Sequence, residues 1–259
     1  MKILLCQPKY YKISYEINPW MHIENKVAHQ KAAKQWKSLE TALRDAGAEL
    51  SHIEPIEGLP DMVFTANGGV VLNNTFITSR FRHEERQGEE KFWHEWFVTH
   101  GYNAILQRFP FEGAGDALWS GKTMFLGHGF RSDPLAAHEI YAELTKEVVL
   151  IKLNDPYFYH LDTCFCPLNE EEALVYPGAI DPLSYRLLGR YIKLIEVDEN
   201  EAKMFACNSV VINKTVIMPK GCRKTKRQLK KRGYKVKMVV MDEFIKAGGA
   251  CKCLTLRID

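Results

Sequence analysis

The chain has 259 residues, of which 46% are hydrophobic and 26% are charged, and this composition excludes a largely disordered protein. No apolar run approaches the ~18 residues of a membrane-spanning helix, and residues 1–11 are predicted to hold a first strand, not a signal peptide. Seven cysteines, an odd number, without a secretion signal favour reduced thiols and a cytoplasmic location. The net charge is +3, yet ten Lys or Arg residues lie within 220–237, so the rest of the chain is net negative. The protein as a whole is therefore not a polycation that seeks nucleic acid.

The predicted elements alternate regularly in chain order. A strand over 2–8 is followed by a helix near 25–47 and a strand over 48–55. After that, the pattern is repeatedly a hairpin, a helix and a strand. The hairpins are predicted at 67–79, 116–127, 162–178 and 208–219, the helices near 85–100, 134–147, 181–192 and 223–232, and the strands over 102–108, 147–153, 192–197 and 234–241. Residues 253–258 resemble the start of a fifth hairpin.

The hairpin starts recur at a nearly constant spacing. They lie at Asn67, Asp116, Asp162, Asn208 and Cys253, which are 49, 46, 46 and 45 residues apart. A period near 50 is typical of a propeller or a closed ring, and the N-terminal strand can complete the unit that 253–258 begins. We therefore predict an α/β fold of five ββαβ units forming a single catalytic domain over residues 1–259. Two α/β domains with coincidental hairpins are the alternative.

A ring would bring residues near the hairpin starts to one central place, although they are distant in sequence. These residues are Asn67, Glu112, His160, Asp162 and Cys253. A cysteine together with a histidine and carboxylates is the combination used in nucleophilic thiol catalysis. Carboxylates also bind a planar cation such as guanidinium through paired hydrogen bonds. The pattern indicates a thiol-dependent site for a cationic small molecule.

Several short motifs carry a family resemblance over nearly the whole chain. FEGAGD at 111–116, HLDT at 160–163 and GGACKCLT at 248–255 resemble motifs of the guanidino-group modifying enzymes of the pentein fold. That group contains arginine deiminases, dimethylarginine dimethylaminohydrolases and arginine amidinotransferases. INPWM at 17–21, PDMVFTAN at 60–67 and HEERQGE at 83–89 are most similar to the arginine dihydrolase domain of cyanobacterial type. The resemblance implies a pentein α/β-propeller that converts arginine to ornithine, carbon dioxide and two ammonia.

The resemblance also implies a role for each site residue. Cys253 is the nucleophile, with Cys251 as its rival, and His160 is the general acid and base. Glu112 and Asp162 would grip the guanidinium group. The amino-acid end would be held by Asn18 and by Arg86, which takes the α-carboxylate, with Arg80 and Arg82 as competitors for that role. No cofactor and no metal are implied.

Asn67 departs from the pattern of arginine deiminases, which carry Asp at this place. An amide is neutral and can both donate and accept hydrogen bonds. It can therefore hold a neutral ureido group as well as a guanidinium. Citrulline could then stay for a second attack, which would give ornithine.

Other interpretations remain open at this stage. A one-step arginine deiminase or dimethylarginine dimethylaminohydrolase would use the same nucleophile. The Cys-x-Cys pairs at 164/166 and 251/253 suggest a zinc site as an alternative, although structural zinc sites more often have a wider gap between the two cysteines. The basic segment 220–237 suggests an alternative function, a non-catalytic ring that binds RNA or protein, but a solvated helix face explains the segment more simply. The main hypothesis has a small-molecule substrate and no membrane partner, and it leaves the oligomeric state open.

Overall fold

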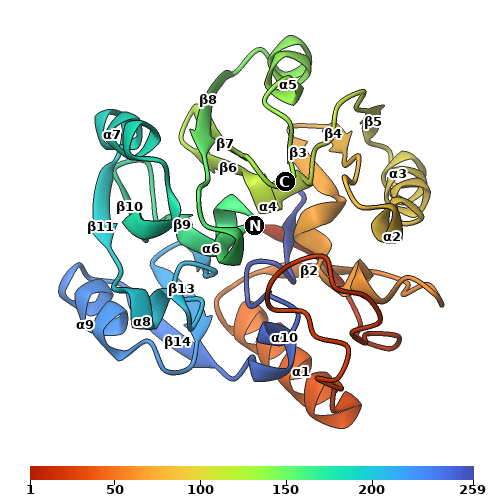
Figure 1. Cartoon of the computed structure of the whole chain (residues 1–259), viewed down its shortest axis with the longest axis horizontal. Helices are drawn as coiled ribbons and strands as arrows, with labels where there is room; N and C mark the ends of the chain where they lie inside the picture. Colours follow the sequence, from red (N-terminus) through yellow and green to blue (C-terminus); the bar gives the residue numbers. More distant parts are fainter.

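The computed structural model describes residues 1–259. Its strands form five separate three-stranded sheets, which are arranged as a ring around a central axis (Figure 1). In this view both chain termini lie near the centre, and the long helices lie on the rim. The predicted fold of five ββαβ units is confirmed.

Four of the sheets are each built from one continuous stretch of chain. In every stretch, an antiparallel hairpin is followed by a helical crossover and by a strand parallel to the second hairpin strand. The first unit holds β3 (Gly69–Leu72), β4 (Thr75–Thr78), α2 (Glu84–Gln87), α3 (Glu90–Thr99) and β5 (Asn103–Leu106). The second holds β6 (Ala117–Ser120), β7 (Thr123–His128), α5 (Ala136–Leu144) and β8 (Glu147–Lys152). The third holds β9 (Phe165–Pro167), β10 (Glu172–Val175), α7 (Pro182–Tyr191) and β11 (Lys193–Glu196), and the fourth holds β12 (Val210–Ile212), β13 (Thr215–Pro219), α9 (Arg223–Lys231) and β14 (Lys235–Val239).

The fifth sheet joins the two ends of the chain. β15 (Leu256–Arg257) pairs antiparallel with β1 (Lys2–Cys6), with Leu256 opposite Leu4. β2 (Glu49–Ile53) pairs parallel with β1, and α1 (His29–Asp45) forms the crossover between them. The order β15-β1-β2 therefore repeats the other units, with the chain interrupted between the first two strands.

The tight turns of three hairpins share one backbone conformation. Asn73, Gly121 and Asn213 have φ angles of 54°, 56° and 53°, in the left-handed region. Glycine and asparagine tolerate this region better than other residues do. The polar two-residue turns seen in the sequence are thus the positions where the chain must reverse in the same way in each unit.

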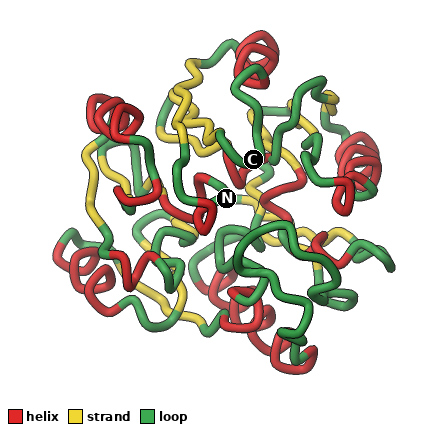
Figure 2. The backbone as a smooth tube through the Cα atoms, viewed as in Figure 1, coloured by secondary structure: helices red, strands yellow, loops and turns green.

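A short helical turn precedes several hairpins and lies on the inner side of the ring (Figure 2). Three of these turns are η2 (Thr65–Gly68), α4 (Gly113–Asp116) and α6 (Leu161–Cys164), and α4 contacts both of the others. They bring residues of the first three units to the axis. The remaining short elements are η1 (Pro60–Val63), η3 (Pro156–Phe158), η4 (Pro177–Ala179), α8 (Glu199–Ala202) and α10 (Asp242–Ile245).

Two predicted helices differ from those observed. The helix expected over 85–100 is divided into α2 and α3 by a turn at Gly88 and Glu89. The helix expected from residue 25 begins at His29, and residues 7–28 form an irregular segment. Hydrogen bonds tie this segment to other units, for example from the Trp20 indole to the Tyr157 carbonyl at 2.7 Å.

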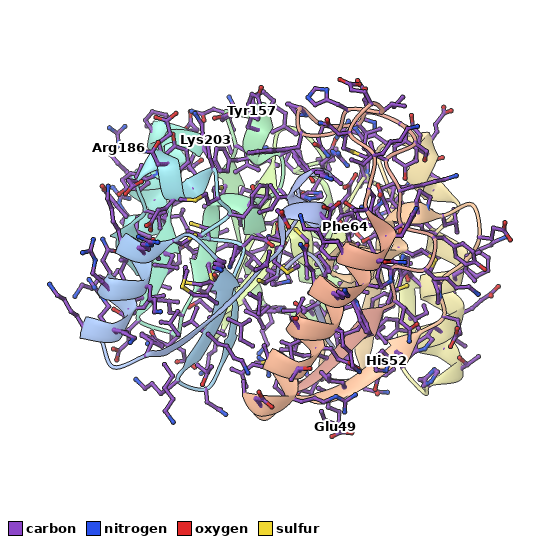
Figure 3. All side chains as sticks on the ribbon, turned by 90° about the horizontal axis from the view of Figure 1, so that it is seen from below. Glu49, His52, Phe64, Tyr157, Arg186 and Lys203 are labelled. Carbon is purple, nitrogen blue, oxygen red and sulfur yellow. The ribbon has the colours of Figure 1, made fainter.

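The apolar core lies between the sheets and the helices on the rim. Its largest cluster contains 28 buried residues from Leu118 to Tyr234, and a second cluster of 24 links the two ends of the chain. From the side, Phe64 lies between the two faces of the ring, with Tyr157 at one edge of the view and Glu49 at the other (Figure 3). No helix has the length and apolar character needed to cross a membrane.

Candidate active site

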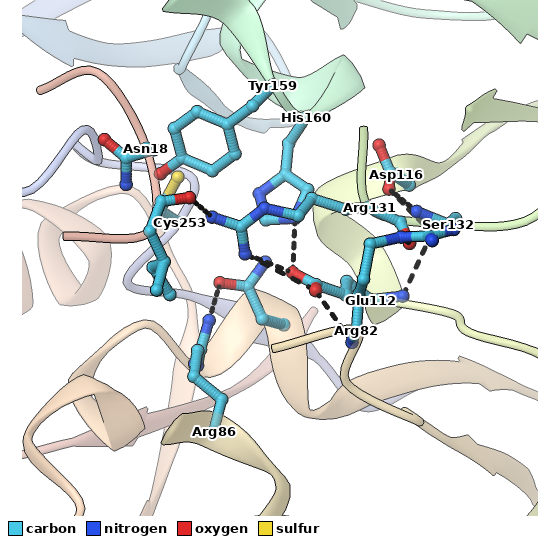
Figure 4. Close-up of polar contacts among 12 residues, drawn as sticks. Asn18, Arg82, Arg86, Glu112, Asp116, Arg131, Ser132, Tyr159, His160 and Cys253 are labelled. Atoms are coloured by element: carbon cyan, nitrogen blue, oxygen red, sulfur yellow. Dashed lines mark hydrogen bonds and ion pairs between the residues drawn. The ribbon is translucent and has the colours of Figure 1, made fainter. Parts of the chain in front are cut away.

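A small, tightly filled pocket lies near the axis and is lined by residues from distant parts of the chain. Residues 17 and 18 of the irregular segment form part of its wall. Its lining residues are Ile17, Asn18, Asp61, Phe64, Asn67, Arg86, Arg131, Tyr159, Ala247 and Cys253. The ring therefore brings the predicted residues Asn18, Asn67, Arg86 and Cys253 to one pocket, which Figure 4 shows in close-up.

Cys253 lies in a turn that Asn208 organises. The Asn208 Oδ1 accepts hydrogen bonds from the backbone N–H groups of Ala250, Lys252 and Cys253 at 3.0–3.2 Å. Its Nδ2 donates to the Cys253 Sγ at 3.1 Å, and Sγ also lies 3.4 Å from the Asp162 Oδ2. The thiol is therefore held in place by groups from the third, fourth and fifth units.

Burial controls the protonation of this pair. Burial, and then the charge of Asp162, raises the pKa of the Cys253 thiol well above its ordinary value. Burial likewise raises the pKa of Asp162 to about 6. A cation bound beside the two groups would favour the ionised form of both. The pocket is thus suited to a cationic ligand, and the thiol is protonated before that ligand binds.

His160 lies close to the same pocket, and Glu112 holds its imidazole ring. Its Nε2 is 2.8 Å from the Glu112 Oε2, and Arg131 donates to the same oxygen at 3.0 Å. Despite complete burial, which raises it, the pKa of Glu112 is held well below its ordinary value by the Arg131 charge and by His160. Glu112, like His160 and Asp162, lies behind the residues that line the pocket, and its carboxylate is a partner of the imidazole. Its role as a guanidinium ligand stays a prediction.

Asp116 fixes the backbone next to His160. Its Oδ1 accepts from the Leu161 N–H at 3.0 Å, and its Oδ2 accepts from the Ser132 hydroxyl at 2.6 Å. Burial raises the pKa of Asp116 to about 6. The acid that opens the second hairpin therefore anchors the start of the third unit, where His160 and Asp162 lie.

Arg86 reaches the pocket, but most of its hydrogen-bond donors are already used. It donates through Nε and Nη2 to Glu89 at 2.8 and 2.9 Å, through Nη1 to the Asn67 Oδ1 at 2.8 Å, and through Nη2 to the Asp61 carbonyl at 3.2 Å. These bonds occupy four of its five N–H groups. Arg80 and Arg82, the competitors, are exposed and do not line the pocket.

Asn18 forms a wall of the pocket, and both ends of its amide are engaged. Its Oδ1 accepts from the Trp20 N–H at 2.9 Å, and its Nδ2 donates to the Ala247 carbonyl at 3.2 Å. These bonds join the irregular N-terminal segment to the chain just before the Cys253 turn. Asn18 therefore fixes the shape of the wall.

Two residues of the centre, Arg131 and Asp61, were not predicted from the sequence. Arg131 lies against the Tyr159 ring, 4.7 Å from its centroid, and donates to the Ile17 carbonyl at 2.8 Å, while its Nε makes no hydrogen bond within the protein. Asp61 is buried, and its Oδ1 has no partner. The only signal in the sequence for Arg131 is its place just after a second hairpin strand, which Arg80 and Arg82 share in the first unit. Asp61 has no such signal.

The remaining cysteines lie outside the pocket. Cys251 is buried in the second apolar cluster, and all seven thiols are free. No three His, Cys, Asp or Glu side chains are grouped so as to hold a metal ion. The two Cys-x-Cys pairs therefore do not form part of a metal cluster in this structure.

The ring of five units, with a buried cysteine, a histidine and carboxylates near its axis, defines the class of pentein enzymes. Comparison with known proteins gives the family. The family model described as N,N dimethylarginine dimethylhydrolase, eukaryotic, matches residues 13–259. The N(G),N(G)-dimethylarginine dimethylaminohydrolase of Mycobacterium tuberculosis is 37% identical over 98% of this chain and 84% of its own length. The chain belongs to the dimethylarginine dimethylaminohydrolase family of pentein proteins.

The similarity to the following relative extends along the entire chain. The bifunctional arginine dihydrolase/ornithine cyclodeaminase ArgZ of Synechocystis is 45% identical over 100% of this chain, which spans 38% of the length of ArgZ. A solved structure of the N-terminal domain of ArgZ, an Asn→Ser variant covalently bonded to a reaction intermediate, has a TM-score of 0.96 and 43% identity and covers 100% of this chain and 97% of that one.

Proposed function

We propose that this protein is an arginine dihydrolase, a hydrolase that acts on guanidino C–N bonds through a covalent cysteine intermediate. Overall, arginine and two water molecules would give ornithine, carbon dioxide and two ammonia. The observation that carries the proposal is a buried asparagine amide, Asn67, in the pocket that holds the Cys253 thiol. The similarity to an arginine dihydrolase solved with a covalent intermediate supports it.

In the first half of the reaction, the guanidinium would bind beside Asp162 and Cys253. Its positive charge favours ionisation of both groups, so the Cys253 thiolate attacks the guanidinium carbon. His160, held by Glu112, protonates the departing ammonia and leaves an amidino thioether. His160 then takes a proton from water, and that water releases citrulline and the thiol.

In the second half, the ureido group of citrulline would be attacked at the same place. The ureido group is neutral, so the site must hold it without a full positive charge on the ligand. A carboxylate at position 67 would keep Arg86 as the partner of one oxygen, but once citrulline formed its other oxygen would be left buried without a cationic ligand, which is costly. Asn67 avoids this cost, and citrulline can remain until it yields ornithine, carbon dioxide and the second ammonia.

For the amino-acid end of the substrate, the structure favours a different assignment from the one expected. Arg131 lines the pocket and its Nε makes no hydrogen bond within the protein, whereas Arg86 has four of its five N–H groups engaged. We therefore assign the α-carboxylate to Arg131. Asp61, with an unpartnered buried carboxylate oxygen, is suited to the α-ammonium group, and Asn18 shapes the wall beside them.

The competing function is a one-step hydrolase, and the Mycobacterium tuberculosis relative, which carries the name of a dimethylarginine hydrolase, is the specific reason to test it. The deciding experiment is product analysis of the purified protein with arginine, citrulline and dimethylarginine in separate reactions. We expect ornithine with about two ammonia per arginine, and consumption of citrulline when it is supplied. Accumulation of citrulline that is not consumed would make the protein a deiminase.

The domain organisation and the cellular location of the enzyme follow from the same proposal. We infer a single catalytic domain over residues 1–259, because the sheet that joins the two chain ends completes the ring around the site. Seven free thiols, none paired in a disulfide, favour the reducing cytoplasm. The exposed basic segment 220–237 has no part in the reaction.

A further inference from the structure

A second cavity, larger than the active-site pocket, lies along the axis of the ring. It has a volume of about 510 Å³, which is within the range of sites that bind small molecules. The first hairpin strand of every sheet contributes to its wall, namely β3, β6, β9, β12 and β15. In Figure 1 these inner strands surround the centre of the ring. The cavity is therefore built by the whole ring and not by one unit.

The cavity opens to solvent at the hairpin turns and the two chain ends. The exposed residues among those that line it mark this open end, and they include Met1, Asn169, Glu170, Asn213, Arg257 and Asp259. Its inner end lies at Lys252, which is placed between the buried Cys251 and Cys253. One residue of chain thus separates the lining of this cavity from the nucleophile.

The Lys252 side chain brings an unpaired positive charge to the inner end. Its Nζ donates to the Ala114 carbonyl at 3.2 Å and takes part in no ion pair, so two of its three N–H groups have no partner within the protein. Burial lowers the pKa of Lys252, although the charge of Asp162 opposes this shift. An anion seated on the ammonium would remove part of the cost of burying the charge.

Most of the remaining wall is apolar, and it holds a second unused donor. The aliphatic lining residues include Ile3, Val70, Leu72, Ala117, Val210 and Leu256. The indole N–H of Trp119, which also lines the cavity, is buried and has no hydrogen-bond partner. The hydroxyls of Ser209 and Thr255 already donate to backbone carbonyls. A ligand that fits this interior must therefore combine an anionic acceptor with a short apolar chain.

We propose that the axial cavity is a binding site for a short aliphatic monocarboxylate, with its carboxylate on the Lys252 ammonium and its chain against the apolar wall. The carboxylate accepts charge-assisted hydrogen bonds from the free N–H groups, and the chain is removed from water. The two acidic residues that line the cavity, Glu170 and Asp259, lie at its open end. They therefore do not compete with the ligand for the cation at the inner end.

Lys252 connects this site to the catalytic centre. Its backbone N–H donates to Asn208 in the turn that carries Cys253. Burial raises the pKa of Asp162, and the charge of Lys252 opposes that rise. A bound carboxylate offsets the charge of Lys252, so a filled cavity should weaken the binding of a guanidinium beside Asp162. This coupling rests on the proposed arginine hydrolysis, whereas the binding site itself does not.

The first test is titration of the full chain with hexanoate, followed by ligand-observed NMR. We expect a Kd of about 1 mM or tighter, which is reasonable for a ligand of this size. Acetate lacks the chain and hexylamine carries the opposite charge, so each should bind at least about tenfold more weakly. Equal binding of acetate and hexanoate would overturn the proposal, because the apolar wall would then play no part. No binding of hexanoate at about 20 mM would overturn it as well.

Substitutions then locate the bound hexanoate. Lys252→Met removes the inner charge and should weaken binding by about tenfold or more. Lys230→Met removes a charge from the exposed basic helix α9, as a matched control, and should leave the Kd within about twofold. Val211→Trp fills the cavity from its wall and keeps Lys252, so it should also weaken binding by about tenfold. It carries the test if Lys252→Met does not fold. Unchanged binding in Val211→Trp, or a loss confined to Lys230→Met, would overturn the proposal.

Kinetics test the coupling separately. Hexanoate at a saturating concentration should raise the KM for arginine severalfold in the wild-type protein and leave it unchanged in Val211→Trp. An unchanged wild-type KM with a filled cavity would overturn the coupling alone. An equal rise in both proteins would show that hexanoate competes in the active-site pocket, and would overturn it too. A wild-type protein that does not hydrolyse arginine would overturn the proposed function, while the binding results would still decide the site.

Discussion

Asn67 and Asn208 stand at equivalent places in two of the five units, and their amides are used in opposite ways. Both are buried, with 3% and 0% of their surface exposed. Asn208 is fully engaged: its oxygen accepts three backbone N–H groups, and its nitrogen donates to the Cys253 Sγ and to the Asp162 carbonyl at 3.1 Å each. Asn67 has one partner, Arg86, and an empty donor.

The difference shows how a repeat can give rise to an asymmetric site. The repeat brings a polar side chain to the axis in every unit, but it does not determine what that side chain contacts. At Asn208 the neighbouring turn and the Asp162 carbonyl supply the partners, so the residue serves to hold the nucleophile. At Asn67 the amide nitrogen packs against Gly115, which has no side chain and offers it no hydrogen bond.

The largest effect should come from the nucleophile that Asn208 holds. Cys253→Ser should lower kcat on the order of a thousandfold or more, because a serine hydroxyl is poorly ionised and is a much weaker nucleophile. Cys251→Ser, two residues earlier and outside the pocket, should retain a large part of the activity. Ammonia release measures both. A folded Cys251→Ser protein without activity, beside an active Cys253→Ser protein, would place the nucleophile at 251.

Replacing the two asparagines should then separate stability from substrate binding. Asn208→Ala leaves three buried N–H groups without an acceptor, and we expect it to lower the free energy of unfolding by about 3 kcal/mol, or about a hundredfold in the unfolding equilibrium. Asn67→Ala removes only the bond to Arg86 and should cost about 1 kcal/mol. Urea denaturation followed by fluorescence compares them. Equal losses would mean that the two positions have the same structural role.

The decrease in activity at acidic pH should report the ionisation of the carboxylates near the nucleophile. Burial raises the pKa of Asp162 to about 6, so the carboxylate that we propose to bind the guanidinium is mostly ionised above that pH and mostly protonated below it. We expect kcat/KM for arginine to level off about one pH unit above 6 and to fall by at least tenfold per unit well below it. Asp116, whose pKa burial also raises to about 6, would steepen the same limb. A profile that stayed flat down to pH 4.5 would rule out this assignment.

The smallest effect concerns the reactivity of the free thiol. Because burial and Asp162 raise the pKa of Cys253, alkylation by iodoacetamide should accelerate steadily with pH through 9 without a plateau. Asp162→Asn removes the negative neighbour, so its Cys253 should react severalfold faster at pH 8. Mass spectrometry of the Cys253 peptide gives the rates, with Cys253→Ser as the blank. Slower alkylation in Asp162→Asn would show that the carboxylate activates the thiol instead.

The fold and the centre of the site could be predicted because the sequence repeats them. Each hairpin carries its own turn signal, and each start carries a polar residue, so a spacing near 50 is enough to place Asn67, Asp162 and Cys253 around one axis. The third strand and the crossover helix of each unit could be predicted from the periodicity of the hydrophobic residues. These are local signals, and the ring geometry turns them into a spatial arrangement.

The partners of buried charges could not be predicted in this way. Nothing in the sequence near Glu112 shows that its carboxylate would be taken by His160 and Arg131, which lie 48 and 19 residues away. The same holds for Arg86, whose guanidinium donates to the Asn67 amide 19 residues away. Such pairings are decided by tertiary packing, so the partners of the Glu112 carboxylate and the Arg86 guanidinium could not be read from the sequence.

The closure of the fifth sheet also determines when the site can form. Cys253 lies three residues before β15, whose partner is β1, and the Cys253 carbonyl accepts a hydrogen bond from the Ala66 N–H at 3.1 Å. Contacts between residues some 190 to 250 positions apart require the entropy of closing a very long loop before they give any stabilisation. Contacts of this kind form slowly and late in folding. During refolding, local hairpins and helices should therefore appear early, and the nucleophile should reach its place only in the slowest phase.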